Sequence, residues 1–278
     1  MIEQILREIV QEKKLQGNSK SLIRNYLKEY IQYLVLSLLY NQNKMKNLVF
    51  KGGSCLRICY ELPRLSEDLD FDYDENILGK KILEELDLYL KKEIRNKYYF
   101  QLETKVQSTI RLYLKFSFLK DLGLTTASES NKLYVKVETS NELSPFAGYT
   151  LTPISKFGFN FVAYHYDMPT LMSGKINALL FRVWIKTSKK QEDEVDIKGR
   201  DFYDLFWFLQ KGIEPNYKML SKTAGIKNKK ELKNILIQRI EKVVTPQKLS
   251  YDLNNFISDS QFVEEFSKNY LTIMNQYF

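Results

Sequence analysis

The sequence is poor in the residues that build disulfides and Cys/His metal sites. It has one histidine, His165, and two cysteines, Cys55 and Cys59, among 278 residues. The cysteines are four residues apart in a stretch with helical spacing, which does not favour a disulfide between them. A single histidine also leaves too few ligands for a Cys/His zinc site, so we expect neither feature.

Long apolar runs are also missing. No stretch approaches the length that a membrane-spanning helix requires, and the N-terminal segment 1–6 has the pattern of an amphipathic helix rather than of a signal peptide. There is no internal repeat and no low-complexity segment. We therefore expect a cytoplasmic protein without a membrane partner.

The composition is that of a globular protein, with 44% hydrophobic and 27% charged residues. The length is sufficient for one large core or two modest ones. The formal net charge of +8 is compatible with a polyanionic partner but says nothing about the fold.

The most informative stretch begins with an apolar run at 48–50, which predicts a short strand. Gly52 and Gly53 interrupt this strand, and Ser54 is expected to cap a helix that continues to Leu62 before Pro63. Backbone N–H groups at such a glycine turn can bind an anion. This segment is therefore a candidate phosphate cradle.

A run of alternating acidic and apolar residues follows at 68–72. This period predicts a strand with one polar face, on which Asp68 and Asp70 point the same way and can share a divalent cation. Asp72 continues the alternation but is expected to lie past the site. A phosphate cradle next to paired carboxylates is what phosphoryl or nucleotidyl transfer requires.

The Gly-Gly-Ser-x-Leu-Arg motif at 52–57, followed by Arg-x-Ser-x-Asp-Leu-Asp-Phe at 64–71, resembles the AbiEii/AbiGii nucleotidyltransferase toxins. These belong to the DNA polymerase β-like superfamily and act in type IV toxin–antitoxin and abortive infection systems; the related MenT toxins add nucleotides to tRNA 3′ ends. The resemblance spans about residues 47–209. It implies an α/β (α+β) nucleotidyltransferase fold with a mixed sheet, an N-terminal helical cap and a helical C-terminal half.

The resemblance also implies roles for residues of the two motifs. Asp68 and Asp70 would bind Mg²⁺, with Mn²⁺ as a substitute, and Glu138 on a neighbouring strand is the candidate third ligand. Ser66 would belong to the catalytic motif, although it could equally be a turn hydroxyl, and Glu138 could equally be half of an exposed Lys–Glu pair. The candidate nucleotide-binding residues of this region are Lys51, Gly52, Gly53, Ser54 and Arg64.

Two further candidates lie in the C-terminal half. Lys175 flanks an apolar helical stripe and would bind the triphosphate, with Asp201 beside it as a catalytic residue. Asp201 and Asp204 share one face at the start of a helix and match an Arg-Asp-x-x-Asp-Leu signature, in which Arg200 could reach phosphate. Without the other motifs, these would be a solvated lysine and an ordinary acidic helix start.

The segment 217–248 carries nine Lys or Arg residues against two Glu, a net charge of +7. Such a cluster favours nucleic acid, because each neutralised phosphate releases counterions, although a solvated helical face has the same composition. The candidate RNA-binding residues are Lys227, Lys229, Lys230 and Lys233.

Hydrophobic periodicity divides the chain into a part with N-terminal helices and a mixed sheet, 1–167, and a helical part, 168–278. The resemblance implies that the first is a nucleotidyltransferase domain and that the second completes its active site. The expected helices are 2–14, 19–42, 76–96, 169–188 and 199–210, with shorter ones to the end. The expected strands after 68–72 are 98–104, 109–119, 132–139 and 159–165, with a loop over 142–153 and a charged loop over 189–196.

These features together predict a nucleotidyltransferase toxin of the EC 2.7.7 type that transfers NMP from NTP to RNA, most plausibly a tRNA 3′ end, and so blocks translation. A cognate antitoxin is implied as a partner. Two alternatives stay open: nucleotidylation of a protein or small-molecule acceptor, and an NTP-binding module that inhibits without turnover.

Overall fold

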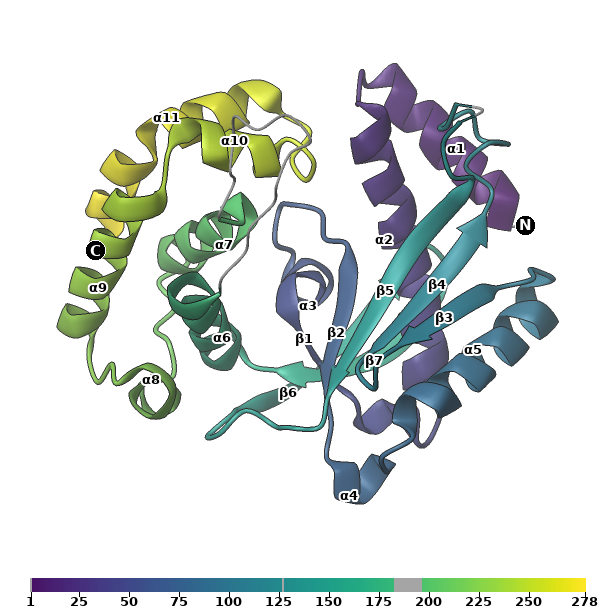
Figure 1. Ribbon diagram of the computed structural model, residues 1–278, viewed down its shortest axis with the longest axis horizontal. Helices are drawn as coiled ribbons and strands as arrows, with labels where there is room; N and C mark the ends of the chain where they lie inside the picture. Colours follow the sequence, from purple (N-terminus) through teal and green to yellow (C-terminus); the bar gives the residue numbers. More distant parts are fainter. Residues whose placement is uncertain (1, 127, 183–196) are drawn as a thin grey trace. The chain divides into compact units, whose positions relative to one another are not determined.

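The computed structural model describes residues 2–126, 128–182 and 197–278, and contacts divide the chain into two compact units (Figure 1). The first unit comprises residues 1–143 and 149–166, and the second comprises 144–148 and 167–278. No helix in the described ranges is long and apolar enough to cross a membrane.

The first unit consists of one mixed sheet and of helices that precede its first strand or connect its strands. Its helices are α1 (Ile2–Leu15), α2 (Lys20–Tyr40), the 3-10 helix η1 (Met45–Asn47), α3 (Gly52–Tyr60), α4 (Glu75–Leu78) and α5 (Ile82–Tyr98). Its strands are β1 (Val49–Lys51), β2 (Asp68–Asp72), β3 (Glu103–Gln107), β4 (Arg111–Ser117), β5 (Lys132–Ser140), β6 (Tyr149–Lys156) and β7 (Phe159–Tyr166).

The strand order is β3-β4-β5-β2-β1-β7-β6. The β2–β5 and β1–β7 pairs are parallel and the other pairs are antiparallel, so the sheet is mixed, as the sequence predicts. Helix α2 packs against β5 and β7, α5 lies alongside β3 and β4, and α3 packs against β1 and β2 (Figure 1). The polar strand β2 is therefore near the middle of the sheet.

The second unit is built of helices. They are α6 (Met168–Phe181), α7 (Gly199–Gln210), α8 (Tyr217–Ala224), α9 (Lys229–Val243), α10 (Pro246–Leu253) and α11 (Ser260–Tyr277). Helix α7 packs against α6, α10 and α11. The core of the second unit is rich in aromatic side chains. Tyr203 and Phe206 both contact Phe266, and the hydroxyl of Tyr270 donates a hydrogen bond to the carbonyl of Phe202.

Several sequence predictions of element boundaries are wrong. The strand expected at 98–104 begins only at Glu103, as β3. Helix α5 continues to Tyr98, and residues 99–102 form a connection that starts with Tyr99 in the left-handed region (φ 55°). The expected helix 76–96 is two helices separated at Gly79, and the expected loop 142–153 contains the start of β6. The predicted helix 169–188 ends at Phe181, and the charged loop 189–196 lies outside the described residues.

Candidate active site

The two aspartates of the predicted metal pair lie on the same face of β2. Asp68 and Asp70 are half-buried, whereas Leu69 between them is fully buried, so the alternation predicted from the sequence is present. Across the parallel ladder, Asp70 is paired in register with Glu138 of β5 and Asp68 with Lys136. Three carboxylates from two neighbouring strands therefore gather on one face of the sheet.

A lysine lies between these carboxylates. Lys136 Nζ is 3.1 Å from Asp68 Oδ2 and 3.2 Å from Glu138 Oε1. Arg111 of β4 donates a further hydrogen bond to the carboxylate of Glu138. Although burial opposes it, these cations lower the pKa of Glu138. The Lys–Glu pair that was one interpretation of Glu138 is present, but it includes Asp68 of the metal pair.

The pKa of Asp70 is raised in this cluster. Burial, and after it the charges of Asp68 and Glu138, raise this pKa to about 6. Both causes disfavour the ionised form of Asp70 in the absence of a cation. An oxygen-only donor set with surplus negative charge fits a hard divalent cation such as Mg²⁺.

The glycine turn brings the backbone close to this cluster. Gly52 begins α3 with φ at +78°, and a Cβ there would collide with the carboxylate of Asp70. A Cβ at Gly53 would lie 2.9 Å from both Arg64 Nη2 and Ser66 Oγ. The two glycines are therefore required by close approach, and the first free N–H groups of α3 lie beside the acidic face.

Ser54 does not cap this helix, which corrects the sequence prediction. Lys51 occupies the N-cap position without a side-chain hydrogen bond, and α3 ends at Tyr60 rather than at Leu62. The buried hydroxyl of Ser54 donates to the backbone carbonyl of Asp68. Ser54 thus joins the start of α3 to β2, and its hydroxyl is engaged in this contact.

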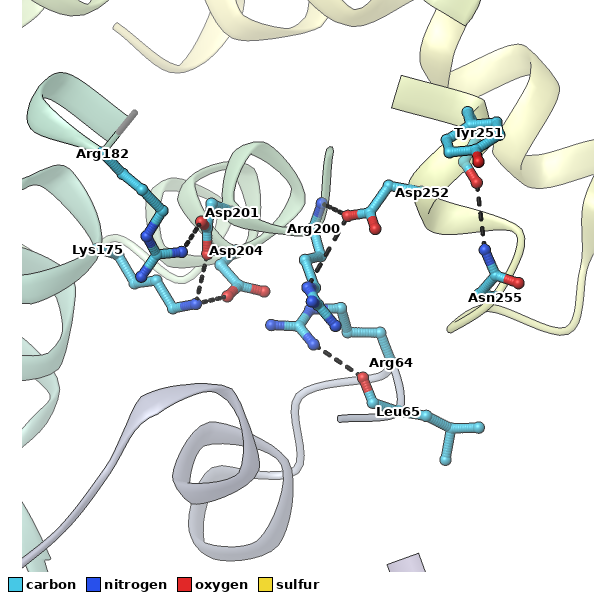
Figure 2. A network of polar contacts seen from close by, with 10 residues as sticks. All are labelled: Arg64, Leu65, Lys175, Arg182, Arg200, Asp201, Asp204, Tyr251, Asp252 and Asn255. Carbon is cyan, nitrogen blue, oxygen red and sulfur yellow. Dashed lines mark hydrogen bonds and ion pairs between the residues drawn. The ribbon is translucent and has the colours of Figure 1, made fainter. Parts of the chain in front are cut away.

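Two other residues of the second motif are buried. Ser66 lies two residues before the start of β2, its hydroxyl is beside Gly53, and its carbonyl accepts a hydrogen bond from Gln32. Arg64 is 2% exposed and donates to the carbonyl of Leu65 at 2.8 Å (Figure 2). Arg64 therefore does not extend into solvent, and its guanidinium lies next to Gly53.

Lys51, at the end of β1, is held by a buried carboxylate. Its ammonium donates to Asp72, and the hydroxyl of Tyr166 donates to the other oxygen of Asp72 at 2.8 Å. Burial raises the pKa of Asp72 despite the attraction of Lys51. Asp72 is thus placed past the aspartate pair, as expected, where it fixes Lys51 at the glycine turn.

In the second unit, the structure brings together the predicted residues of α6 and α7. Lys175 Nζ lies 2.7 Å from both Asp201 Oδ1 and Asp204 Oδ2 (Figure 2). Arg182 Nη1 lies 2.7 Å from the other oxygen of Asp201. Asp204 is fully buried and Lys175 is 14% exposed on its side chain. The charges form a compact, largely desolvated network with Lys175 at its centre.

Arg200 has a different environment from Lys175. Its backbone N–H donates to Asp252 Oδ2 at 3.0 Å, and its Nε is 3.9 Å from the same carboxylate (Figure 2). Its guanidinium also lies over the ring of Phe256, 4.4 Å from the ring centroid. These contacts tie the start of α7 to the end of α10.

The predicted RNA-binding lysines lie around the start of α9. Lys227 and Lys230 are exposed, Lys233 is half-buried, and Lys229 is 3.4 Å from Glu214. Lys227 also lines a pocket of about 550 Å³. The other residues that line it are Phe146, Tyr217, Lys218, Ser221 and Lys222.

One cluster was missed by sequence reasoning. Cys55, Cys59 and His165 offer two sulfur atoms and a ring nitrogen that all lie within 4.8 Å of one another. The register of β7, in which His165 is opposite Phe50 of β1, brings the histidine next to α3. No local sequence pattern links Cys59 to His165, which is 106 positions away. The numbers of cysteines and histidines in the chain therefore did not indicate this cluster.

Comparisons with known proteins agree with this architecture. The model of the AbiEii nucleotidyl transferase toxins of type IV toxin–antitoxin systems matches residues 34–278. The nucleotidyltransferase toxin MenT4 of Mycobacterium tuberculosis shares the fold with a TM-score of 0.54 and 16% identity, over 97% of this chain and 89% of that one. JHP933 of Helicobacter pylori has a TM-score of 0.47 and 16% identity, over 91% of each chain.

No curated protein sequence matches the chain. The family match nevertheless extends from the middle of α2 to the last residue and includes both motifs and both units. The chain belongs to the AbiEii family of nucleotidyltransferase toxins of type IV toxin–antitoxin systems.

Proposed function

We propose that this toxin transfers NMP from an NTP to RNA, most plausibly to a tRNA 3′ end, in a reaction that requires a divalent cation. The observation that carries the proposal is the acidic face formed by Asp68, Asp70 and Glu138 beside the glycine turn that begins α3. Carboxylates and free backbone N–H groups are side by side there, as a metal-bound triphosphate requires.

Asp68 and Asp70 are the residues that would hold Mg²⁺ or Mn²⁺, with Glu138 as the third carboxylate. When bound, such a cation supplies charge neutralisation at the reacting phosphate. The raised pKa of Asp70 supports this role. Burial and neighbouring like charges disfavour the ionised form of Asp70, and a bound cation would stabilise that form.

The phosphates would be bound by the chain's own donors. The N–H groups at Gly52, Gly53 and Ser54 belong to the unpaired first turn of α3, where the helix dipole favours an anion. Lys51, fixed by Asp72, adds a positive charge at the same turn. Ser66 and Arg64 act by supporting this turn, because their side chains fill the space that Gly53 leaves.

In the second unit, Lys175 is the cation proposed to neutralise the triphosphate. Asp201 and Asp204 hold its ammonium in one orientation, so little side-chain freedom remains to be lost on binding. Their role is positioning. Arg200 is assigned to the packing of α7 and, through that, to the placement of Asp201 and Asp204.

The bonds of the proposed reaction are those of an in-line displacement. The 3′-hydroxyl oxygen of the acceptor attacks the α-phosphorus, the bond from that phosphorus to the bridging oxygen breaks, and pyrophosphate leaves. The hydroxyl proton passes to a carboxylate of the acidic face.

The acceptor is assigned to RNA on the basis of the charge of the second unit. Lys227, Lys229, Lys230 and Lys233 contribute to the net charge of +7 over 217–248, which would attract a phosphate backbone. The lysine-lined pocket beside Phe146 and Tyr217 adds aromatic faces on which a base can stack. Extension of a tRNA 3′ end would prevent aminoacylation and so block translation.

The family also implies a cognate antitoxin and action in the cytoplasm, where tRNA, NTP and Mg²⁺ are available. The decisive test is incubation of the purified protein with total tRNA, Mg²⁺ and each labelled NTP in turn. We expect label on tRNA from one preferred nucleotide, and none with Asp68→Ala. Label on a protein acceptor would replace RNA in the proposal, and NTP binding without label on any acceptor would favour the sequestering module.

A further inference from the structure

The cluster of Cys55, Cys59 and His165 is not used in the proposed reaction. Two of its members, Cys55 and His165, are fully buried, and Cys59 is half-buried. We propose that these three side chains form a binding site for a thiophilic metal ion, Zn²⁺, separate from the acidic face.

The spacing of the ligands fits this assignment. Cys55 and Cys59 are four residues apart on α3, so their side chains lie on one face of the helix, as the two histidines of a helical zinc motif do. Bond lengths to tetrahedral zinc place its ligand atoms roughly 3.5–3.8 Å apart. Because all three atoms already lie within 4.8 Å of one another, a closure of about 1 Å per pair is enough to bind the ion.

The surroundings of the histidine select the correct tautomer. His165 Nδ1 lies 2.9 Å from the carbonyl oxygen of Tyr166, which can only accept, so Nδ1 carries the proton. Nε2 therefore has the lone pair, and it accepts from the hydroxyl of Thr152 at 2.9 Å, a rotor that can turn away. A ring N–H that donates to a backbone carbonyl is the usual support of a metal-binding histidine.

The chemistry of the donor set favours zinc over the cation of the acidic face. Two sulfur atoms and one imidazole are soft and borderline ligands, which bind Zn²⁺ far better than Mg²⁺. Three protein ligands leave a fourth position, which the partial exposure of Cys59 opens to water. Bound zinc would add a link between α3 and β7, which a hydrogen bond from the hydroxyl of Tyr60 to the carbonyl of Tyr166 already joins.

Cobalt is the probe for this site, because a thiolate–Co²⁺ bond gives a charge-transfer absorption that carboxylate ligands cannot give. We would titrate Co²⁺, then Zn²⁺, into the full chain carrying Asp68→Ala, which removes an oxygen ligand of the acidic face. The proposal expects one equivalent of Co²⁺ to produce the charge-transfer band and tetrahedral visible bands, and one equivalent of Zn²⁺ to abolish both.

Cys59→Ala, in the same Asp68→Ala background, is the matched variant, and its fold is checked by thermal unfolding without metal. It should lose the cobalt bands and the increase in Tm that Zn²⁺ gives its parent. If it does not fold, His165→Gln takes its place with the same expectation. The absence of bands in the parent, or their persistence in the folded variant, would overturn the proposal. Neither result depends on nucleotidyl transfer.

Discussion

Asp70 of β2 and Glu138 of β5 are direct neighbours across a parallel strand pair, and Lys136 connects Glu138 to Asp68. This relationship explains why the three carboxylates can remain together. Lys136 and Arg111 compensate part of their charge. Burial, together with the charges of Asp68 and Glu138, still raises the pKa of Asp70. The predictions below follow from this arrangement and from the network around Lys175.

The stability of the metal-free protein should depend on the ionisation of Asp70. Its pKa of about 6 is above that of an unfolded aspartate, so its contribution to stability is complete below about pH 4 and is lost as the pH rises through 6. Asp70→Asn removes this loss. We expect the variant to be more stable than wild type at pH 7.5 by on the order of 1–2 kcal/mol, since partial exposure weakens the effect.

Urea unfolding in the presence of a chelator, at pH 7.5 and at pH 4, measures this difference. Most of the gain should disappear at pH 4, where Asp70 is protonated in the folded state and about half protonated in the unfolded state. A gain of equal size at the two pH values would mean that the charge of Asp70 is not its cause.

Gly52→Ala should be more harmful than a typical glycine substitution. The backbone is at φ +78°, and the new methyl group would collide with the Asp70 carboxylate. Gly17→Ala is a matched control, because Gly17 has φ +75° and nothing within 4 Å of its Cβ position. We expect a loss of unfolding free energy of about 1 kcal/mol for the control and about 3 kcal/mol for Gly52→Ala.

Both variants are compared by urea unfolding and by Mg²⁺ binding. Only Gly52→Ala should also weaken Mg²⁺ binding, because its methyl group displaces Asp70. Equal losses of stability in the two variants would show that the backbone conformation alone accounts for the effect.

Lys175→Met should strongly destabilise the second unit. Without the ammonium, buried Asp204 has lost the ion-pair partner that lies 2.7 Å from it, and Asp201 has lost one of its two cationic neighbours, Lys175, while the ion pair with Arg182 stays. Removing one partner of a buried ion pair costs about 3–5 kcal/mol. Lys230→Met, at an exposed lysine of α9, is the control and should change stability by less than about 0.5 kcal/mol.

The double variant Lys175→Met with Asp204→Asn tests the cause of that loss. If the loss comes from the unpaired charge, neutralising Asp204 should restore part of the unfolding free energy in a double-mutant cycle. Additive losses would instead indicate that Lys175 stabilises α6 by packing.

Lys136→Ala should tighten Mg²⁺ binding. Lys136 competes with a cation for Asp68 and Glu138, and a positive charge next to the metal site opposes binding. Near a protein surface the effect of one such charge is about 1–2 kcal/mol, or roughly tenfold in Kd. The control is Lys132→Ala. Lys132 lies on β5, like Lys136, but pairs with Glu103 of β3, so this variant should leave the Kd for Mg²⁺ unchanged. Weaker binding in Lys136→Ala would show that Lys136 shapes the site rather than competing for it.

The sequence was sufficient to predict the parts of the fold that have strong periodicity. The alternation at 68–72 gave β2 with its polar face, and Gly199–Gln210 was predicted to the residue. Strand β6 was missed because its proline, Pro153, and the glycine just before the strand resemble a loop. The strand is at the edge of the sheet, where proline is tolerated. The aromatic run at 98–100 resembled a strand, but Tyr98 ends helix α5 and Tyr99 is its C-cap.

The candidate site could be predicted in its residues but not in its pairings. Asp68, Asp70 and Lys175 came from motif order. By contrast, the contact of Lys136 with two carboxylates depends on the register of β2 against β5, which no local pattern specifies. The same holds for the Tyr166–Asp72 hydrogen bond and for the cysteine–histidine cluster, since each joins residues about 100 positions apart.

The central claim is transfer of the α-phosphoryl group, and it is tested most directly by the position of the label. Purified protein is incubated with total tRNA, Mg²⁺ and the preferred NTP, labelled either at the α- or at the γ-phosphate. The controls are Asp68→Ala and Asp259→Ala, the latter at an aspartate that caps α11. We predict that α-label enters RNA, that γ-label leaves as pyrophosphate, and that only Asp68→Ala is inactive. Transfer of γ-label to any acceptor, or full activity of Asp68→Ala, would contradict the account.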